Sequence, residues 1–496
     1  MFNEYASLFE FLQKQNTKVY LVGGAVRDIL MNQPSHDLDF VVLGDASHLA
    51  RMTANHLHGA YYLMDEEHGI ARVLIDTPQF TNLVLDFSDA RGGSLESDLK
   101  CRDFTVNAIA LDLTAQKIID PLEGSVHLRQ KVLKICNPES FIQDPIRVLR
   151  AIRFSLYLNL RIEPETKSLL YQAMPYLPGI SGERQRDELI RMLGGGKSAA
   201  AVRVLHHTGI LNLLLPEVGI LLKDQQTSPV TSYSVDLPAR TLQNADMILD
   251  FIEGKRDLIP ENLYSNLIFL HWGRFRQRLL HHLQNHLNAD RSLRGLICLA
   301  GLFFPAIAGQ TIKPYYREPL FPQTDSLIER LKFLAFSKAE IQYFQKIITN
   351  ANLFFDLLDI NRDSPARDND DLTNPAHHLG GREIYRYFKT SGEAGIDICL
   401  LSLALFGAQS GYELNQKEYT RLLEIVDELF EGYWEHNPQI IHPQPLITGD
   451  DIMKNLSIQA GEKVGQILEM IKEEQAAGNI QTQQQAFDFA RTILNR

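Results

Sequence analysis

The hydrophobic periodicity of this chain changes once along its length, and that change limits the possible fold more than any other feature. Up to about residue 133, short apolar or β-branched runs alternate with segments of helical spacing. The runs that read as strands are residues 18–22, 38–43, 71–75 and 83–87, and residues 25–31 have helical spacing. Strands that alternate with helices predict a mixed α/β module.

After this module the strand signal fades, and helical spacing continues toward the end of the chain. Residues 145–157, for example, distribute their apolar side chains as an amphipathic helix does. Turn-rich stretches interrupt the helices at residues 215–217, 223–238, 359–375 and 437–445. The sequence therefore predicts an α/β head followed by a long helical body.

The composition argues against several classes of protein. The 496 residues are 45% hydrophobic and 22% charged, unlike a largely disordered chain, and the 4 scattered Cys suit neither a disulfide framework nor a cysteine zinc site. We see no long uninterrupted apolar run and no secretory signal, so we expect a soluble, cytoplasmic protein without a membrane partner. The net charge of −12 argues against a non-specific nucleic-acid coat, yet basic residues outnumber acidic ones between residues 141 and 210, where an anion could bind.

A glycine pair follows the first predicted strand and precedes a helix. At such a turn, Gly23 and Gly24 let backbone N–H groups approach a phosphate, and the helix N-terminus favours negative charge. Arg27 lies in the first turn of that helix and could reach the same phosphate, while Arg102, in the later segment 98–110, could bind a triphosphate. Taken alone, a glycine pair of this kind is more often an ordinary connection between a strand and a helix.

Two aspartates stand at the start of the next predicted strand. Because strand side chains alternate between faces, Asp37 and Asp39 point the same way while Leu38 points to the core. Carboxylates about 7 Å apart can bridge metal ions, and such oxygen ligands suit Mg²⁺, which also takes substrate phosphates into its shell. Two ions could activate an attacking hydroxyl and stabilise a leaving pyrophosphate. The alternative is a solvated strand end, but the phosphate-type turn upstream favours the functional interpretation.

A third segment, residues 143–154, combines one acidic residue with regularly spaced arginines. Arg147, Arg150 and Arg153 recur every three residues and form a basic ridge along a helix, with Asp144 at its N-terminal end. Asp accepts and Arg donates hydrogen bonds, so this pair can address the edge of a base while the later arginines meet phosphates. The alternative is a solvated helix face with internal ion pairs.

Together these segments resemble the class II nucleotidyltransferase family, which comprises tRNA CCA-adding enzymes, A-adding enzymes and bacterial poly(A) polymerases. Five motifs of the family occur in the same order and with family-like spacing. They are residues 23–28 with 37–39, 101–108, 120–124, 143–154 and 183–189.

The resemblance implies an α+β fold. The expected domains are a polymerase-beta-like nucleotidyltransferase head with a mixed sheet and helices (1–135), an all-α neck with nucleotide-template and tRNA-binding motifs (136–222), a helical body (223–440) and a C-terminal helical tail (441–496). The body resembles, more weakly, a degenerate HD-type domain, in which residues 302–305 stand where a His-Asp doublet is expected. We therefore expect a body without hydrolytic activity that supports RNA binding.

The resemblance also implies a role for each candidate residue. Asp37 and Asp39 are the implied catalytic residues and hold Mg²⁺, and Asp86 is a possible third carboxylate at the metals. The implied nucleotide-binding residues are Gly24, Arg27, Arg102, Asp144, Arg147, Arg150 and Arg153. Among them, Asp144 and Arg147 act as a protein template that reads CTP or ATP.

The implied activity is template-independent addition of C, C and A to the tRNA 3′ end from CTP and ATP, with release of pyrophosphate. An A-adding enzyme or a poly(A) polymerase is the close alternative, because these enzymes share the motifs; the lack of a basic extension favours tRNA. A further alternative is an RNA-binding module without catalysis, since Cys101, His127 and Gln143 depart from the family motifs. The sequence leaves the oligomeric state open.

Overall fold

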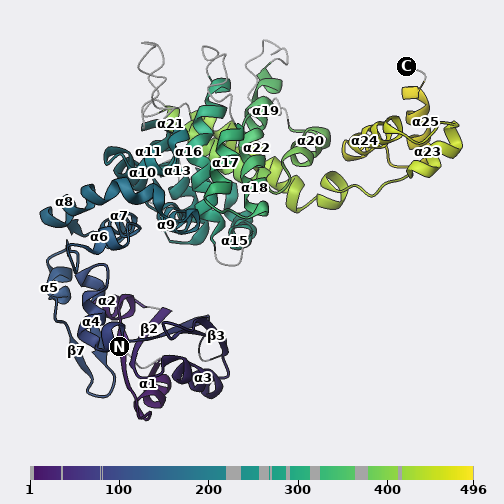
Figure 1. The fold of residues 1–496 in the computed structure, drawn as a ribbon. Coiled ribbons are helices and arrows are strands. Elements are labelled where there is room, and N and C mark those ends of the chain that lie inside the picture. Colours follow the sequence, from purple (N-terminus) through teal and green to yellow (C-terminus); the bar gives the residue numbers. More distant parts are fainter. Residues whose placement is uncertain are drawn as a thin grey trace. The chain divides into compact units, whose positions relative to one another are not determined.

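The computed structural model of the protein describes residues 5–34, 37–78, 80, 82–218, 236–255, 267–268, 271–285, 287, 291–312, 324–362, 378–410 and 416–494. Two of the predicted turn-rich stretches, 223–238 and 359–375, lie almost entirely outside these residues. The chain divides into two compact units, Met1–Glu188 and Leu189–Arg496. Figure 1 colours the chain along its sequence and labels many of its helices and strands.

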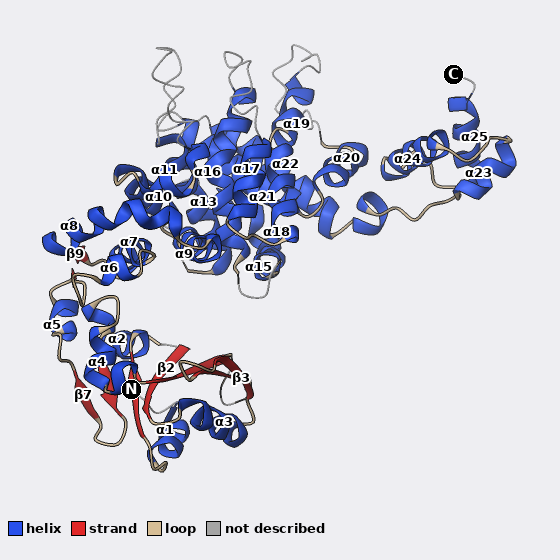
Figure 2. Ribbon diagram, in the orientation of Figure 1, coloured by secondary structure: helices blue, strands red, loops and turns tan. Residues whose placement is uncertain are grey.

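A seven-stranded mixed sheet forms the centre of the first unit (Figure 2, red). Its strands are β1 (Lys18–Val22), β2 (Asp37–Leu43), β3 (Ala60–Asp65), β4 (Ile70–Ile75), β5 (Leu83–Asp89), β6 (Ala110–Asp112) and β7 (Lys117–Ile119). Their order across the sheet is β3-β4-β5-β2-β1-β6-β7. The pair β2 and β5 is parallel, and the other neighbouring pairs are antiparallel.

Helices cover both faces of this sheet because its central strands are apolar on both sides. On one face, Leu21 of β1 and Phe40 of β2 share a hydrophobic core with α1 (Ala6–Gln13) and α3 (Ala46–Leu57). On the other face, Val22 and Val41 pack against α4 (Leu95–Lys100). Asp37 and Asp39 have the same parity as Val41 on β2, so they belong to the face that carries α4.

Four further helices complete the first unit and lead into the second. They are α6 (Ser140–Gln143), α7 (Arg147–Tyr157), α8 (Pro164–Ala173) and α9 (Gly182–Gly194), while α2 (Gly24–Leu30) and α5 (Gly124–Arg129) precede them in the chain. Two short strands, β8 (Val132–Leu133) and β9 (Arg161–Ile162), pair in parallel; in the sequence they stand before α6 and after α7. The ring of Phe104 contacts those of Phe141 and Phe154 edge-on, which packs α6 and α7 against the segment that follows α4.

Helices make up all the regular elements that the structure describes in the second unit. They are α10 (Ser198–His207), α11 (Ile210–Leu214), α13 (Asp236–Glu253), α15 (Arg276–Gln284), α16 (Leu293–Ile312), α17 (Thr324–Phe333), α18 (Lys338–Thr349), α19 (Leu353–Arg362), α20 (Gly381–Ser391), α21 (Ala394–Ser410), α22 (Gln416–Trp434), α23 (Gly449–Leu456), α24 (Glu462–Ala476) and α25 (Gln483–Leu494). Where their side chains are described, the two apolar helices α16 and α21 are almost entirely buried, and both pack against α13, which places the core of this unit around them.

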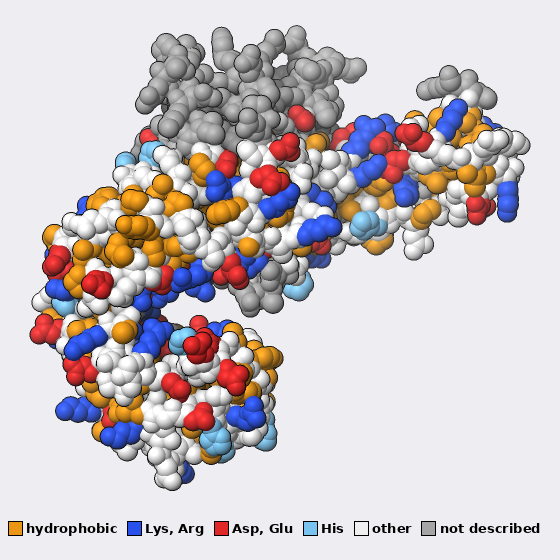
Figure 3. Space-filling model, in the orientation of Figure 1, with side chains coloured by type: hydrophobic (Ala, Val, Ile, Leu, Met, Phe, Trp, Pro, Cys, Tyr) orange, Lys and Arg blue, Asp and Glu red, His pale blue; other side chains and the backbone are white. Residues whose placement is uncertain are grey.

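The last three helices form a small group with a hydrophobic core of its own. Ile452 of α23, Ile467 of α24 and Ala486 of α25 are fully or almost fully buried within it. Side chains of α20 contact α24 through the pairs Arg382–Glu474, Arg386–Glu473 and Lys389–Glu469. Figure 3 shows acidic and basic side chains interspersed over this part of the surface.

The apolar character of α16 and α21 raises the question of membrane insertion. Within the described residues, no single helix has both the length and the hydropathy to cross a membrane. One bent pair, Gly381–Ser391 with Ala394–Gln409, meets the criteria jointly, on length and composition alone.

Candidate active site

The connection between β1 and α2 is a tight glycine turn. Gly23 has φ +74° and ψ −132°, a conformation that L side chains rarely adopt, and α2 begins at the next residue. A Cβ atom on Gly23 would lie 2.8 Å from Nη1 of Arg102, whereas one on Gly24 would lie 3.5 Å from Nη2 of Arg27. Gly23 is therefore required both by its backbone conformation and by the nearby guanidinium, whereas a Cβ at Gly24 would make only an ordinary contact.

The two aspartates of β2 lie beside this turn. Asp39 pairs with Val22 of β1 on one side and with Asp86 of β5 on the other. Burial raises the pKa of Asp39 to about 6; the carboxylates of Asp86 and Asp37 add to this rise, while the guanidinium of Arg102 opposes it. Three acidic side chains thus share one face of the sheet, with Asp37 exposed at the strand end.

The third carboxylate is already engaged by an arginine. Nε and Nη2 of Arg72 donate to the two oxygens of Asp86 at 2.8 and 2.9 Å. Among the described residues, no group of three or more His, Cys, Asp or Glu side chains is placed to hold a metal ion. The available donor set is thus the pair Asp37 and Asp39. Two carboxylates fit Mg²⁺, which typically binds through one or two of them and keeps waters and substrate phosphates.

Two arginines approach the glycine turn from different elements. Arg102 follows α4, and its Nε donates to Oδ2 of the buried Asp98 at 3.0 Å while Nη1 faces Gly23. Arg27, in α2, donates through Nη1 to Oδ1 of Asn107 at 2.6 Å and through Nε to Asp28 at 2.8 Å. Both positive charges therefore stand at the turn, each held by neighbouring acceptors.

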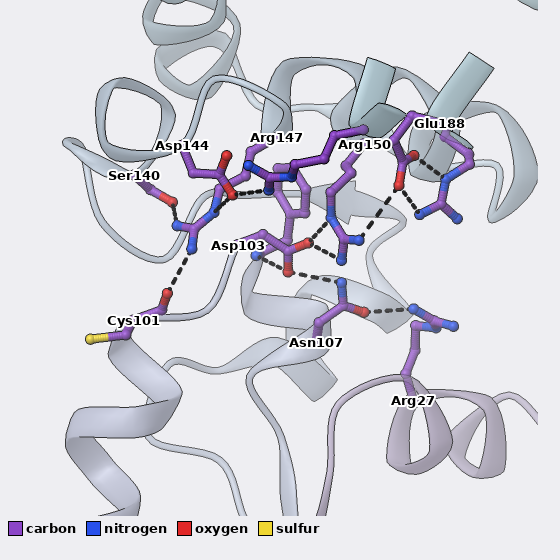
Figure 4. A network of polar contacts seen from close by, with 12 residues as sticks. Arg27, Cys101, Asp103, Asn107, Ser140, Asp144, Arg147, Arg150 and Glu188 are labelled. Carbon is purple, nitrogen blue, oxygen red and sulfur yellow. Dashed lines mark hydrogen bonds and ion pairs between the residues drawn. The ribbon is translucent and has the colours of Figure 1, made fainter. Parts of the chain in front are cut away.

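Arg27 belongs to a continuous chain of polar contacts (Figure 4). Nδ2 of Asn107 donates to Oδ1 of Asp103 at 3.0 Å, and Nε of Arg150 donates to Oδ2 of Asp103 at 2.8 Å. Asp103 is only 7% exposed. Burial alone would raise the pKa of Asp103, but Arg150 and the hydrogen bonds outweigh it and hold that pKa below its ordinary value. Asp103 is therefore a buried, ionised acceptor.

The chain of contacts continues from α7 to α9. Arg153 donates to Glu188 through Nε at 2.7 Å, and Nη1 of Arg150 lies 3.6 Å from the same carboxylate. In this structure Arg150 and Arg153 are thus turned toward Asp103 and Glu188. Sequence spacing placed the two arginines on one ridge, but it gave no sign of these carboxylate partners.

The predicted base-reading pair lies at the start of α7. Nε of Arg147 is 3.8 Å from Oδ2 of Asp144. The same carboxylate oxygen accepts a hydrogen bond from Nη2 of Arg184 at 2.8 Å, and Nη2 of Arg147 donates to the carbonyl of Cys101 at 3.0 Å. A further contact joins Arg147 to Ser140 (Figure 4). Each member of the pair is thus braced by another segment.

Four residues of this site were not singled out by the sequence analysis: Asp103, Asn107, Arg184 and Glu188. The first two belong to the second family motif and the other two to the fifth, so motif membership was the available signal. The departures from the motifs are peripheral in this structure. Cys101 contributes its backbone carbonyl, Gln143 donates to Glu139 at 3.4 Å, and His127 contacts Thr105 at 3.0 Å.

In the described part of the helical body, no group of three or more His, Cys, Asp or Glu side chains is placed to hold a metal ion. Residues 302–305, where a His-Asp doublet was expected, are apolar and lie inside α16. His282 is buried and contacts Asp397 at 3.1 Å, and the hydroxyl of Tyr343 donates to the same aspartate. The sequence has three pairs of adjacent histidines, 206/207, 281/282 and 377/378, and His377 lies outside the described residues.

Three family models match separate parts of the chain. The "Poly A polymerase head domain" matches residues 19–134, the "Probable RNA and SrmB- binding site of polymerase A" matches residues 159–221, and tRNA nucleotidyltransferase domain 2 matches residues 393–490. The first match contains the glycine turn, both β2 carboxylates and Asp103.

Several tRNA nucleotidyltransferases align with nearly the whole chain. A CC-adding tRNA nucleotidyltransferase of Geobacter sulfurreducens is 28% identical over 469 residues, which are 94% of this chain and 90% of that protein. An A-adding tRNA nucleotidyltransferase of Deinococcus radiodurans is 28% identical over 479 residues, covering 95% and 94% of the two chains.

A solved structure is similar in fold to nearly the whole of this chain. The complex of a CCA-adding enzyme with ATP has a TM-score of 0.63 and 21% identity, and the match covers 99% of this chain and 96% of that one. The predicted α+β fold, with a mixed-sheet head and a helical body, is thereby confirmed. The motifs, the fold and three family models that each match part of the chain support the family of CCA-adding tRNA nucleotidyltransferases and poly(A) polymerases.

Proposed function

We propose that the protein is a nucleotidyltransferase that adds C and A residues to the 3′ end of tRNA from CTP and ATP without a nucleic-acid template. The observation that carries the proposal is the position of Asp37 and Asp39 on β2, beside a glycine turn that two arginines approach. This arrangement combines a carboxylate pair with a phosphate-binding turn and positive charge, as transfer of a nucleotidyl group requires.

Asp37 and Asp39 would hold Mg²⁺, which supplies charge stabilisation at the reacting phosphate. The other roles belong to the chain itself. The backbone of the turn and the N-terminus of α2 would bind the triphosphate, and Arg102, whose Nη1 lies close to Gly23, would neutralise its charge. Arg27 would orient the same phosphates while it remains held by Asn107. The 3′-hydroxyl of the RNA attacks the α-phosphate, and pyrophosphate leaves.

Selection of the base would fall to Asp144 and Arg147. The carboxylate accepts and the guanidinium donates hydrogen bonds, so the pair can complement the edge of cytosine or adenine. The contacts of Asp144 with Arg184 and of Arg147 with Cys101 hold the two side chains near each other before a nucleotide arrives. Exposed basic residues between positions 141 and 210, such as Arg161 and Lys167, would meet the RNA backbone. This activity would place the protein with tRNA in the cytoplasm.

A second candidate is addition of the two cytidines alone. It is favoured by the CC-adding relative, which aligns with 94% of this chain. The A-adding relative aligns with 95% of the chain and favours addition of A alone in the same way. The experiment that separates these activities uses tRNA transcripts that end before C-C-A, after one C, or after C-C. Each is incubated with Mg²⁺ and CTP, ATP or both, and its 3′ end is read at single-nucleotide resolution.

Each product identifies one activity. Complete C-C-A on the shortest transcript supports the proposal, and arrest after C-C supports the second candidate. Addition of A to the C-C end alone indicates an A-adding enzyme, and long A tails indicate a poly(A) polymerase. No addition to any transcript contradicts the proposal and leaves an RNA-binding module.

Variants of the carboxylate pair separate catalysis from binding. D37A and D39A should abolish incorporation while tRNA affinity stays within about twofold of the wild type, because metal ligands contribute little to RNA contacts. The matched control is D65A, which removes an exposed carboxylate from another strand of the same sheet and should leave incorporation unchanged. Full incorporation by D39A would refute the assignment.

A further inference from the structure

Among the described residues, the sheet face that carries Asp39, the catalytic face, is covered over only part of its width. Beside β2, Val41 is buried against α4. On β4 and β3 the side chains of the same face remain accessible, since Leu74 is 39% and Tyr62 is 49% exposed. On the opposite face of these strands, Val73 is buried in the core that includes α3. The part of the catalytic face that β3, β4 and β5 form is therefore an open, partly apolar surface.

Strand register connects this open surface to the catalytic pair. Asp39 of β2 pairs with Asp86 of β5, which in turn pairs with Arg72 of β4. Arg72 pairs with Tyr62 of β3, the strand at the edge of the sheet (Figure 1). Cross-strand partners share a face, and Leu74, two residues after Arg72, points the same way. Three strand spacings of about 4.8 Å place Tyr62 about 14 Å from Asp39 across the sheet. The side chain of Arg72 is 43% exposed, so its guanidinium is accessible to solvent while it holds Asp86.

The direction of the proposed reaction indicates what this surface binds. In an in-line displacement, the attacking and leaving oxygens lie on opposite sides of the α-phosphorus. The 3′-oxygen forms its bond to phosphorus as the bond to pyrophosphate breaks, and the hydroxyl proton passes to water. Gly23 follows β1, on one side of β2, so the pyrophosphate leaves toward that side. The strands β5, β4 and β3 lie on the other side of β2. The acceptor therefore approaches across the open surface.

We propose that the side chains of Tyr62, Arg72 and Leu74 form the docking surface for the unpaired 3′-terminal nucleotides of the acceptor RNA. Arg72 meets the phosphate next to the terminal nucleoside, and the ring of Tyr62, farther from Asp39, stacks on a base upstream. An aromatic ring accepts any base, because every base has a π-face. This tolerance suits an acceptor whose last base changes at each addition. The inference rests on the proposed function and names the RNA contacts of the same site.

The test measures the KM for acceptor RNA and the KM for the incoming nucleotide separately. Loss of one stacked base weakens binding about tenfold, so Y62A should raise the KM for RNA by that factor while kcat and the nucleotide KM stay within about twofold of the wild type. Y62F keeps the ring and should behave as the wild type does. The matched control is L63A, because Leu63 is 45% exposed on the same strand but pairs with the buried Ala71 and belongs to the opposite face.

Acceptor RNAs that lack one base test the stacking contact without a change in the protein. Each RNA carries a single abasic nucleotide at one of its last unpaired positions, and fluorescence anisotropy measures its affinity. With the wild type, one of these positions should weaken binding about tenfold. With Y62A, the same position should cost less than about twofold, because the ring that contacts the base is already absent. Equal losses with both proteins at every position would overturn the inference.

Other outcomes would also overturn the inference. An unchanged KM for RNA in Y62A would exclude the ring as a contact, and an equal rise in L63A would show that the effect does not depend on the catalytic face. A change in the oligomeric state of Y62A, measured by light scattering, would assign this edge of the sheet to a second copy of the chain instead. A wild type that incorporates nothing would contradict the proposed function, whereas the affinities for abasic RNAs would still decide whether RNA docks on this face.

Discussion

The buried Arg294 of α16 allows a quantitative prediction of stability. Its side chain is 2% exposed and faces three carboxylates of α13. Nη2 lies 2.7 Å from Asp250 and 3.2 Å from Asp246, and Nη1 contacts Glu253. The variant R294M keeps an unbranched side chain but removes the guanidinium that contacts all three acids. We therefore expect it to destabilise the second unit strongly.

The expected loss of unfolding free energy depends on the contacts that each carboxylate keeps in R294M. Asp246 still accepts two hydrogen bonds from Ser198 at 2.8 Å, and Glu253 keeps Lys255 at 2.7 Å. Removal of one partner from a buried ion pair costs about 3–5 kcal/mol, and the retained contacts favour the lower end, near ~3 kcal/mol. For a large domain, that corresponds to a fall of about 6–12 °C in melting temperature.

The assay is thermal and chemical unfolding of the full chain, with R386M as the control. Arg386 pairs with Glu473, but its side chain is 60% exposed, so its loss should cost less than about 1 kcal/mol. A deficit in R294M no larger than that of R386M would refute the reasoning.

The deficit in unfolding free energy of R294M, relative to the wild type, should also depend on pH. Burial raises the pKa of Asp246 even beside Arg294, and without the arginine it should rise further. A carboxyl group with a raised pKa in the folded state is tolerated when protonated. The deficit should therefore be smallest below about pH 4, the ordinary carboxyl range, and grow as the pH rises through the raised value. A deficit independent of pH would contradict this explanation.

Three further changes test other parts of the structure. G23A should lose far more incorporation and thermal stability than G24A, because only Gly23 combines a positive φ with a close guanidinium; equal effects in the two variants would contradict this. Burial raises the pKa of Asp427 to about 6 despite its contact with His271, so the wild type should gain stability relative to D427N as the pH falls from about 7 to 4. Denaturant titrations across that range measure the unfolding free energies of both proteins, and parallel pH profiles of the wild type and D427N would contradict this reasoning. Removal of divalent ions with EDTA should stop incorporation, and added Mg²⁺ should restore it; gel analysis of the tRNA 3′ end measures both.

The sequence predicted those strands whose burial is regular. β1 and β2 lie at the centre of the sheet, and residues such as Leu21 and Val22 are buried on opposite faces, which produces recognisable apolar runs. β3 escaped prediction because it is an edge strand, where Tyr62 and Met64 are 49% and 58% exposed and no alternation survives. β6 and β7 have three residues each, too few for a periodicity.

The candidate site also has one part that the sequence could predict and one part that it could not. The shared face of Asp37 and Asp39 is a local property of a strand, so spacing alone could predict it. The contact between Asp103 and Arg150 joins residues 47 positions apart, and it depends on how α7 packs against Phe104. Residue spacing contains no information on such packing. The arginine ridge was therefore assigned to phosphates, whereas Arg150 and Arg153 face carboxylates in this structure.

The attachment of the last three helices to α20 has a consequence for the behaviour of the protein in salt. The small group has its own apolar core, but its charged contacts with α20 are pairs such as Arg386–Glu473 and Lys389–Glu469, with substantially exposed cations. Added salt screens exposed charges over about 3 Å at 1 M, compared with about 8 Å under physiological conditions, while apolar burial is not weakened in this way. The three helices thus form a folded module whose anchorage, unlike its interior, depends on ionic strength.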